Sequence, residues 1–328
     1  MEQPTTQHNL STSSFKEIAV FFLKLALFTG LVILFLLHVM PQFAGNYTAA
    51  LIDKAERLRS IDGERIVLIG DSNLVFGMDS QKLEEALGMP VVNMGLHGGI
   101  GNAVHEEMGK FRVNPGDIYV LSYVHYSDND KILDIMPVWC AIEDHFDLWQ
   151  ILRLKDSVKM FRGFPIYFKK CMEYYETDTG NQDYGGVYSR NNFNCYGDMA
   201  AFRGETEYDF DEFIPAPELN DTTRNRLNEL NRYFQERGAT LLIAAHPVGY
   251  GPMTADREEF KAFQEQLEAG LDCDVISDFT DYLMDYSYFY DTQYHLTTEG
   301  AGFRTDKLIR DLRNWAYRSG YCFPADVK

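Results

Sequence analysis

Three short segments, far apart in the chain, carry the residue types of an activated serine. Ser72 follows a short apolar run in the segment GDSN, while Asp291 and His295 lie near the C-terminus in the segment DTQYH. A serine hydroxyl is a weak nucleophile at neutral pH unless a histidine takes its proton and a carboxylate orients that histidine. Together these residues predict acyl transfer, whereas Ser72 alone is more typical of a helix cap.

An acyl-transfer site also needs donors for the negative charge that develops on the carbonyl oxygen. The backbone amides of Ser72 and of Gly95, in the segment NMGLHGG, are the two candidates. Glycine at the second position lets a reacting group approach the backbone closely. We expect substrate contacts from Asn73, His97 and His125, and keep the alternative that these two histidines only make local hydrogen bonds.

The elements that must position these residues follow a repeated strand and helix order. Alternation of this kind predicts a parallel sheet with right-handed crossovers and helices on both faces. Ligand sites in such sheets form outside the carboxyl ends of the strands, where the candidate residues lie. The predicted strands are 66–69, 91–94, 118–124, 240–248 and 274–279, and the main predicted helices are 80–87, 102–111, one from 221, 255–269 and 298–318.

The fold expectation is therefore an α/β domain of three layers, α/β/α, with about five parallel strands as in flavodoxin-like proteins. The strand rhythm lapses over residues 126–218, which predicts a central insertion rich in aromatic residues. The expected division is a tail at 1–17, a transmembrane helix at 18–40, a partly helical connector at 41–63, and one domain at 64–328 that includes the insertion.

The segment 18–40 is apolar throughout, with Lys24 as its one clear charge. Its length suits a single helix across a bilayer, and Lys24 is near enough to one end to reach the headgroups. A buried core helix is the alternative, and a cleaved signal peptide fits less well because no small-residue cleavage site follows. We expect a single-pass protein of the cell membrane with a cytoplasmic N-terminus and an extracytoplasmic body.

The composition limits the partners and cofactors. A formal net charge of −19 argues against a nucleic-acid partner, because phosphate binding requires a concentrated basic surface. The five cysteines are widely spaced without a CxxC pair, so neither a metal site nor a redox motif is predicted, and their pairing stays open. The segment GLHGGIG allows a dinucleotide loop as an alternative, but its spacing differs from GxGxxG. We expect no cofactor.

At the blocks GDSN, NMG and DTQYH the sequence resembles the SGNH, or GDSL-type, hydrolase family. The resemblance covers residues 64–318 apart from the insertion. It implies Ser72 as the nucleophile, Gly95 as an oxyanion donor, and Asp291 with His295 as the rest of a catalytic triad. Three residues, rather than the usual two, separate Asp291 from His295, which is similar to the membrane-anchored branch that works beside membrane-bound O-acyltransferases on cell-envelope polymers.

The family pattern has a further block after the third strand, between NMG and DTQYH, and the sequence departs from the pattern there. In place of the usual oxyanion asparagine, the segment YVHYSDND offers Tyr123, His125 and Tyr126, and Asn129 lies further along the loop. The resemblance implies a serine esterase or O-acyltransferase acting on acyl, usually acetyl, esters of an envelope or exported polysaccharide. Because of the altered block, the alternative is a non-catalytic protein that binds glycan or scaffolds a membrane-bound O-acyltransferase.

Overall fold

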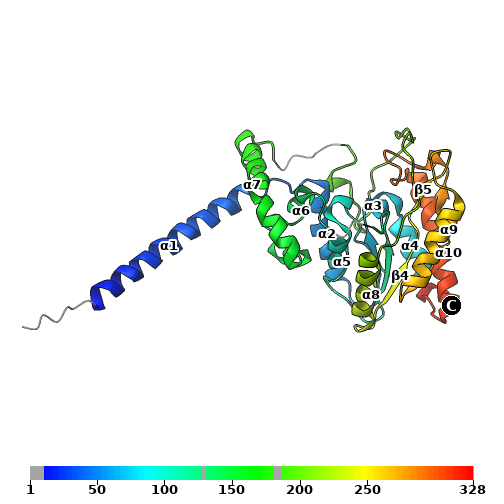
Figure 1. The fold of residues 1–328 in the computed structure, drawn as a ribbon, viewed down its shortest axis with the longest axis horizontal. Coiled ribbons are helices and arrows are strands. Elements are labelled where there is room, and N and C mark those ends of the chain that lie inside the picture. The colour runs from blue at the N-terminus through cyan, green and yellow to red at the C-terminus, as the bar shows by residue number, and fades with distance from the viewer. Residues whose placement is uncertain (1–10, 128–130, 181–185, 328) are drawn as a thin grey trace, which may run out of the picture.

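The computed structural model describes residues 11–127, 131–180 and 186–327. Within this part of the chain, five parallel strands form a central sheet in the order β2-β1-β3-β4-β6. The register pairs Ile66 of β1 with Val91 of β2 and Ile118 of β3, so the three strands end at one edge. The fold is therefore α/β around a parallel sheet, as the sequence pattern predicts (Figure 1).

The helices and strands have the following bounds. The strands are β1 (Ile66–Gly70), β2 (Val91–Asn93), β3 (Ile118–Ser122), β4 (Thr240–Ile243), β5 (Val248–Gly249), β6 (Asp274–Val275) and β7 (Leu283–Met284). The helices are α1 (Ser11–Val39), α2 (Leu51–Ser60), α3 (Ser72–Gly77), α4 (Ser80–Leu87), α5 (Asn102–Gly109), α6 (Ile135–Ile142), α7 (Leu154–Thr177), α8 (Asp221–Gln235), α9 (Arg257–Gly270) and α10 (Thr298–Ser319), with short 3₁₀ turns that include η1 (Tyr47–Ala50) and η3 (Phe146–Ile151).

Apolar side chains on the two faces of the sheet belong to two separate buried clusters. Strand residues such as Val67 and Leu121 join the cluster that α2, α5 and α8 complete, whereas Leu68 and Val120 join the cluster of α4 and α10. Alternate residues of a strand point to opposite faces, so the continuous apolar runs predict burial on both sides. Figure 1 shows α2, α5 and α8 on one side of the sheet and α4 and α10 on the other.

The predicted strands are found at their places, and all but the first, which extends to Gly70, end earlier than expected. The strand from Ile118 ends at Ser122 rather than at residue 124, and the strand from Asp274 is two residues long. The run 240–248 divides into β4 and β5, and β5 pairs with β7 in a small second parallel sheet that the sequence did not indicate. Periodicity locates an element more reliably than it locates the last paired residue.

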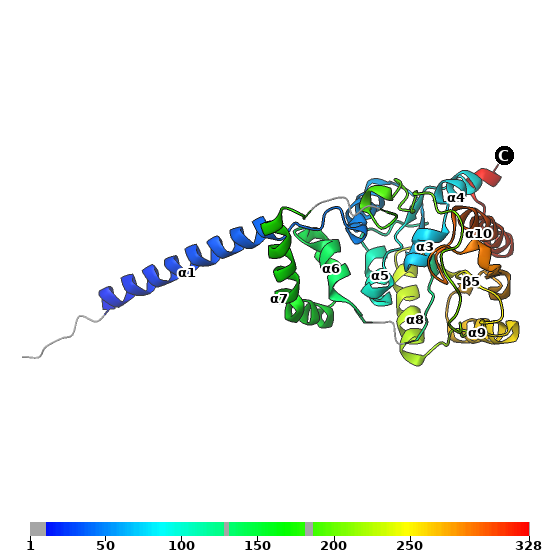
Figure 2. The ribbon, with the colours of Figure 1, turned by 90° about the horizontal axis from the view of Figure 1, so that it is seen from above.

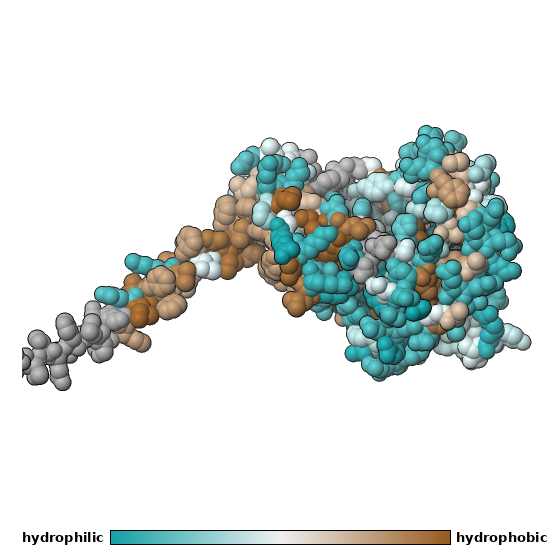
Figure 3. Space-filling model, viewed as in Figure 1, coloured by the Kyte–Doolittle hydropathy of each residue, from teal (hydrophilic) through white to brown (hydrophobic). Residues whose placement is uncertain are grey.

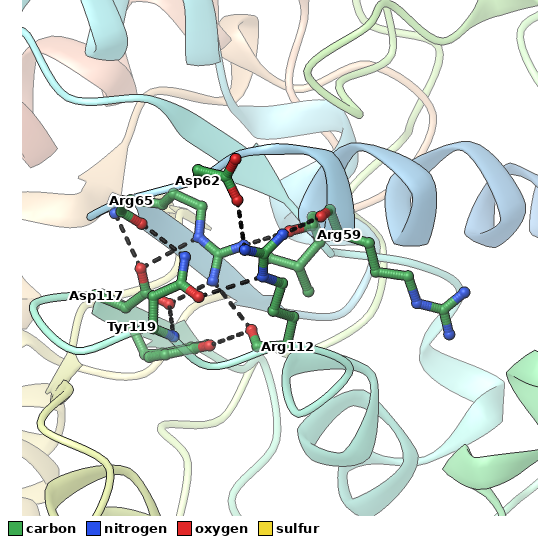
Figure 4. Close-up of polar contacts among 9 residues, drawn as sticks. Arg59, Asp62, Arg65, Arg112, Asp117 and Tyr119 are labelled. Carbon is green, nitrogen blue, oxygen red and sulfur yellow. Dashed lines mark hydrogen bonds and ion pairs between the residues drawn. The ribbon is translucent and has the colours of Figure 1, made fainter.

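A buried ion pair stabilises the edge of the sheet that is formed by the amino ends of the strands (Figure 4). Arg65 precedes β1 and Asp117 precedes β3, both side chains are fully buried, and their closest N–O distance is 2.5 Å. Asp117 also accepts the backbone amide of Arg65 at 3.0 Å, and the Arg65 guanidinium donates to the Arg112 carbonyl at 3.1 Å. The ion pair thereby holds the amino ends of β1 and β3 together, at the opposite edge of the sheet from Ser72.

The connector packs into the body instead of bridging to it. Tyr47, Leu51 and Leu58 are almost completely buried in the cluster that covers one face of the sheet. Helix α1 extends away from the body, and its segment Phe15–Val39 is the one described helix long and apolar enough to cross a membrane (Figures 1 and 2). Helix α7, within the insertion, lies beside the end of α1.

Candidate active site

Ser72, His295 and Asp291 meet at the carboxyl edge of the sheet. His295 Nε2 lies 2.8 Å from Ser72 Oγ, and His295 Nδ1 lies 2.8 Å from Asp291 Oδ1. Ser72 begins α3 directly after β1, whereas the other two residues lie in the loop between β7 and α10. Because 2.8 Å is within hydrogen-bond distance, a proton can pass from the hydroxyl to the imidazole without rearrangement of the backbone.

The turn that presents Ser72 is held from below by a buried polar network. Asp71 caps α3 by accepting the Asn73 amide at 2.9 Å, and its other oxygen accepts the Val124 amide at 3.1 Å. This is the structural role that the turn position of Asp71 indicates. Arg304, from α10, donates to the Asn73 carbonyl at 2.7 Å and to the Asn73 side chain at 2.8 Å.

The prediction that Asn73 contacts substrate is therefore wrong. Asn73 is completely buried, and its amide group donates to Asp71 Oδ1 and to the Ser122 carbonyl. As the second residue of a helix that begins at the strand end, it turns toward the core while Ser72 stays at the surface of the site. Asn73 links the buried charges of Asp71 and Arg304, and burial lowers the pKa of Arg304 to about 10.

His295 is held by groups from two other segments. The ring of Phe76 stacks on its imidazole with centroids 4.1 Å apart, one helical turn after Ser72. Arg203, from the insertion, is buried and donates to the Leu296 carbonyl at 2.8 Å and to the Phe76 carbonyl at 3.1 Å. Arg203 thus ties the histidine loop to α3, which fixes the distance between the imidazole and the serine.

A tyrosine of the insertion also forms a hydrogen bond with the carboxylate of Asp291. Tyr188 donates its hydroxyl to Asp291 Oδ2 at 2.5 Å, and the Tyr188 hydroxyl oxygen is 3.3 Å from His295 Nδ1. Partial burial raises the pKa of Asp291, but the hydrogen bonds from His295 and Tyr188 outweigh it, so the net pKa is lowered. The carboxylate is therefore kept ionised and oriented by two donors, one on each oxygen.

The geometry does not support Gly95 as an oxyanion donor. Its amide donates to Asn93 Oδ1 at 2.9 Å, so the N–H is engaged within its own loop. Close packing explains the glycine, since a Cβ at this position would lie 2.8 Å from Leu74 Cβ and 3.0 Å from the Asp71 carbonyl oxygen. The Ser72 amide, as the first of α3, has no acceptor within the helix and remains the predicted donor.

A cavity of about 460 Å³ opens beside the serine. His97 and Tyr188 belong to its walls together with Ser72, His295 and a short run of the histidine loop. Nδ1 of His97 accepts the Gly99 amide at 2.9 Å, which confirms the local hydrogen bond. Burial lowers the pKa of His97, so the neutral ring carries its proton on Nε2 and can donate it to a ligand.

His125 is exposed and lies outside the residues that line this cavity. Its ring packs edge to face on Tyr294 with centroids 5.9 Å apart, and Tyr294 forms the wall. The predicted substrate contact of His125 is therefore not supported, and Tyr294 lines the cavity at this place. No sequence signal separates these two aromatic side chains, because their distance from the serine depends on the loop path.

The segment after β3, where the family pattern has an oxyanion asparagine, places no asparagine side chain at the serine among the described residues. Tyr123 and Tyr126 are fully buried, and the Tyr123 hydroxyl donates to the Asn102 carbonyl at 3.0 Å. Asn129 lies outside the described residues. The buried Tyr47 lines the cavity instead, and its hydroxyl has no hydrogen-bond partner in the described part of the chain. Nothing in the connector sequence marks Tyr47 as a site residue.

The segment 191–199 of the insertion neither lines the cavity nor forms a free loop. Its Tyr196 carbonyl accepts the amide of Asn93, the last residue of β2, at 2.8 Å. Asp198 is buried and accepts the Ser80 hydroxyl at 2.7 Å and the Asn93 side chain at 2.8 Å. Burial lowers the pKa of the neighbouring Lys54 to about 7. The segment supports the turn after β2.

The comparisons with known proteins leave the family open. No family model matches the chain, and no curated protein matches it. Within residues 11–127, 131–180 and 186–327, no group of three or more histidine, cysteine or acidic residues is placed to hold a metal ion. All five cysteines are free thiols in the structure, so none is paired with another.

Proposed function

We propose that the chain is a membrane-anchored serine esterase or O-acyltransferase of the SGNH type, with a three-layer α/β/α domain outside the cytoplasm. One observation carries the proposal: the hydrogen-bonded line from Ser72 Oγ through His295 to Asp291, at 2.8 Å for each step. A buried parallel sheet presents this line at its carboxyl edge, where α/β enzymes bind ligands.

The chemistry follows from the three side chains. Ser72 Oγ attacks the carbonyl carbon of an acyl ester while its proton passes to His295 Nε2. Collapse of the tetrahedral intermediate breaks the ester C–O bond, and the same proton passes from His295 to the leaving alcohol oxygen. Water or a sugar hydroxyl then attacks the acyl-serine with the proton transfers reversed, which restores Ser72. Asp291 stabilises the imidazolium in both stages.

The ligand contacts differ from the usual family pattern. The Ser72 amide and the Nε2–H of His97 are the donors that this geometry offers to a substrate oxygen. Tyr47 lines the same cavity, and its buried hydroxyl has no hydrogen-bond partner among the described residues. These donors are compatible with a neutral acyl ester of an envelope or exported polysaccharide, and the tether at α1 raises the local concentration of a surface polymer or a membrane-bound O-acyltransferase.

The test uses the full chain in detergent. A fluorophosphonate probe is expected to label Ser72, and p-nitrophenyl acetate is expected to be hydrolysed, with both lost in Ser72→Ala. Ser60→Ala is the matched control, because Ser60 is an exposed serine at the end of α2. Equal labelling and equal hydrolysis in Ser72→Ala and the parent chain would exclude Ser72 as the nucleophile.

A non-catalytic role is the second candidate, and the engaged amide of Gly95 favours it. A protein that only binds an acylated glycan, or holds an O-acyltransferase in place, needs no oxyanion donors. In that case the full chain binds acetylated polysaccharide equally well in the Ser72→Ala variant, and the fluorophosphonate probe labels neither protein.

A further inference from the structure

Helix α7 presents an exposed apolar stripe toward solvent. Leu154, Val158 and Phe161 are 85%, 46% and 60% exposed. Their spacing of four and three residues places them on one face of the helix. An apolar stripe of this kind on a surface helix indicates a contact that the isolated chain does not contain.

The same face of α7 contacts the membrane-spanning candidate α1 further along. Phe168 and Tyr175 follow Phe161 at intervals of seven residues and so lie on the same side of the helix. The Phe168 ring packs edge to face on Phe35 with centroids 6.2 Å apart, and the Tyr175 hydroxyl lies 3.0 Å from His38 Nε2. The exposed stripe is therefore continuous with the surface that already holds α1.

Basic residues flank this stripe in a chain that is otherwise acidic. Lys155, Arg162 and Lys169 each follow a stripe residue directly, so they form a ridge along one side of it. Helix α7 contains five lysines and arginines against three acidic residues, whereas the whole chain has a net charge of −19. Long basic side chains beside an apolar stripe are typical of helices that lie at a bilayer surface.

Aromatic residues of η3 extend the apolar surface. Phe146 is 58% exposed and packs on Trp149 with ring centroids 5.5 Å apart, and Trp149 packs on Phe161 at 6.1 Å. Tryptophan and other aromatic residues favour the headgroup region of a membrane. Figures 1 and 2 show α7 lying across the end of α1 in both views, and Figure 3 shows apolar side chains continuing from α1 onto this part of the body.

We propose that α7 and η3 form a second membrane contact, which lies flat on a bilayer with anionic headgroups while α1 crosses it. This contact does not depend on the esterase chemistry. The proposed membrane contact also places the active site relative to the bilayer. Lys170 and Tyr174 of α7 line a cavity of 670 Å³ that shares Tyr47 and Tyr188 with the cavity at the serine. The combined cavity then opens near the headgroups.

The experiment places an environment-sensitive nitrobenzoxadiazole probe on the full chain in lipid nanodiscs. The probe is attached at Phe161→Cys after the exposed thiols are removed by Cys195→Ser and Cys322→Ser. The matched control carries it at Tyr317→Cys, because Tyr317 is another aromatic residue, 90% exposed, on α10 away from α1. The nanodiscs contain phosphatidylcholine with or without phosphatidylglycerol, and lipids with nitroxide groups serve as quenchers.

The proposal predicts a blue shift and loss of most of the fluorescence at position 161, with neither change at position 317. Phosphatidylglycerol should increase the quenching, and the variant Lys155→Gln, Arg162→Gln, Lys169→Gln should remove that increase. Equal and weak quenching at the two positions would overturn the proposal. Shielding of position 161 only in the presence of another membrane protein would overturn it as well, since the face would then bind protein.

Discussion

Glu143 follows helix α6 and places a buried carboxyl group at the junction of α1 with the body. Its Oε1 accepts the Gln42 amide at 3.2 Å and the Tyr167 hydroxyl at 2.9 Å. Its Oε2 accepts the Phe43 amide at 3.2 Å. Burial raises the pKa of Glu143 to about 8, because the hydrogen bonds from Tyr167 and the two amides only partly offset the loss of hydration.

The raised pKa makes the folded state bind a proton that the unfolded chain releases. The stability from this group is fully present below the ordinary pKa of 4.5 and is lost as the pH rises to about 8. At about 1.4 kcal/mol for each pH unit, the loss between about pH 5 and about pH 9 is roughly 4 kcal/mol. The protonated form has a partner, because Tyr167 can accept that proton and donate to the Met40 carbonyl 3.0 Å away.

Glu143→Gln isolates this effect, since glutamine retains a donor and cannot ionise. The measurement is the melting temperature of both full chains in the same detergent from about pH 5 to about pH 9. The variant should gain on the parent by roughly 8 °C across this range, at about 2 °C for each kcal/mol. Buried His105 and His246 titrate in both proteins, so their contributions cancel in the melting-temperature difference. A melting-temperature difference that stays constant with pH would refute the reasoning.

Three further predictions concern the site and its supports. Asp291→Asn should lower the rate of fluorophosphonate labelling about 10⁴-fold, because an amide favours the wrong histidine tautomer, and a smaller loss than tenfold would count against the triad. Asn73→Ala leaves the buried guanidinium of Arg304 short of acceptors, so melting should fall by the equivalent of about 2–3 kcal/mol together with labelling. Asp117→Asn should remove about 3–5 kcal/mol of stability by leaving Arg65 without its counter-ion, yet labelling of the folded protein should not change, since this pair lies at the other edge of the sheet.

The sequence was sufficient to predict the sheet and the meeting of Ser72 with His295. Apolar runs locate the strands, and parallel strands bring their carboxyl ends to one edge regardless of the chain length between them. The same reasoning failed for Asn73 and Gly95. Both lie at a strand end, but which of their groups turn to the core depends on the exact turn, and a hydrogen bond to Asn93 removes the Gly95 amide.

The contributions of the insertion were beyond prediction from the sequence. Tyr188 and Arg203 lie in segments with no helical or strand periodicity, so nothing in the pattern indicates what they contact. The Arg203 guanidinium donates to four backbone carbonyls. Because every residue has a carbonyl, no residue type in the sequence marks these partners. Positions of this kind follow only from the path of the whole chain.

The walls of the cavity connect the site to the segment that follows the apolar helix α1. Tyr47 belongs to the connector that follows α1, and its ring packs on Tyr188 of the insertion with centroids 5.8 Å apart. Both rings line the cavity at Ser72 and the cavity that Lys170 of α7 borders. A chain shortened to begin at residue 64 would keep Ser72 and His295 but lose one wall. The connector that follows α1 thus supplies a wall of the cavity beside Ser72.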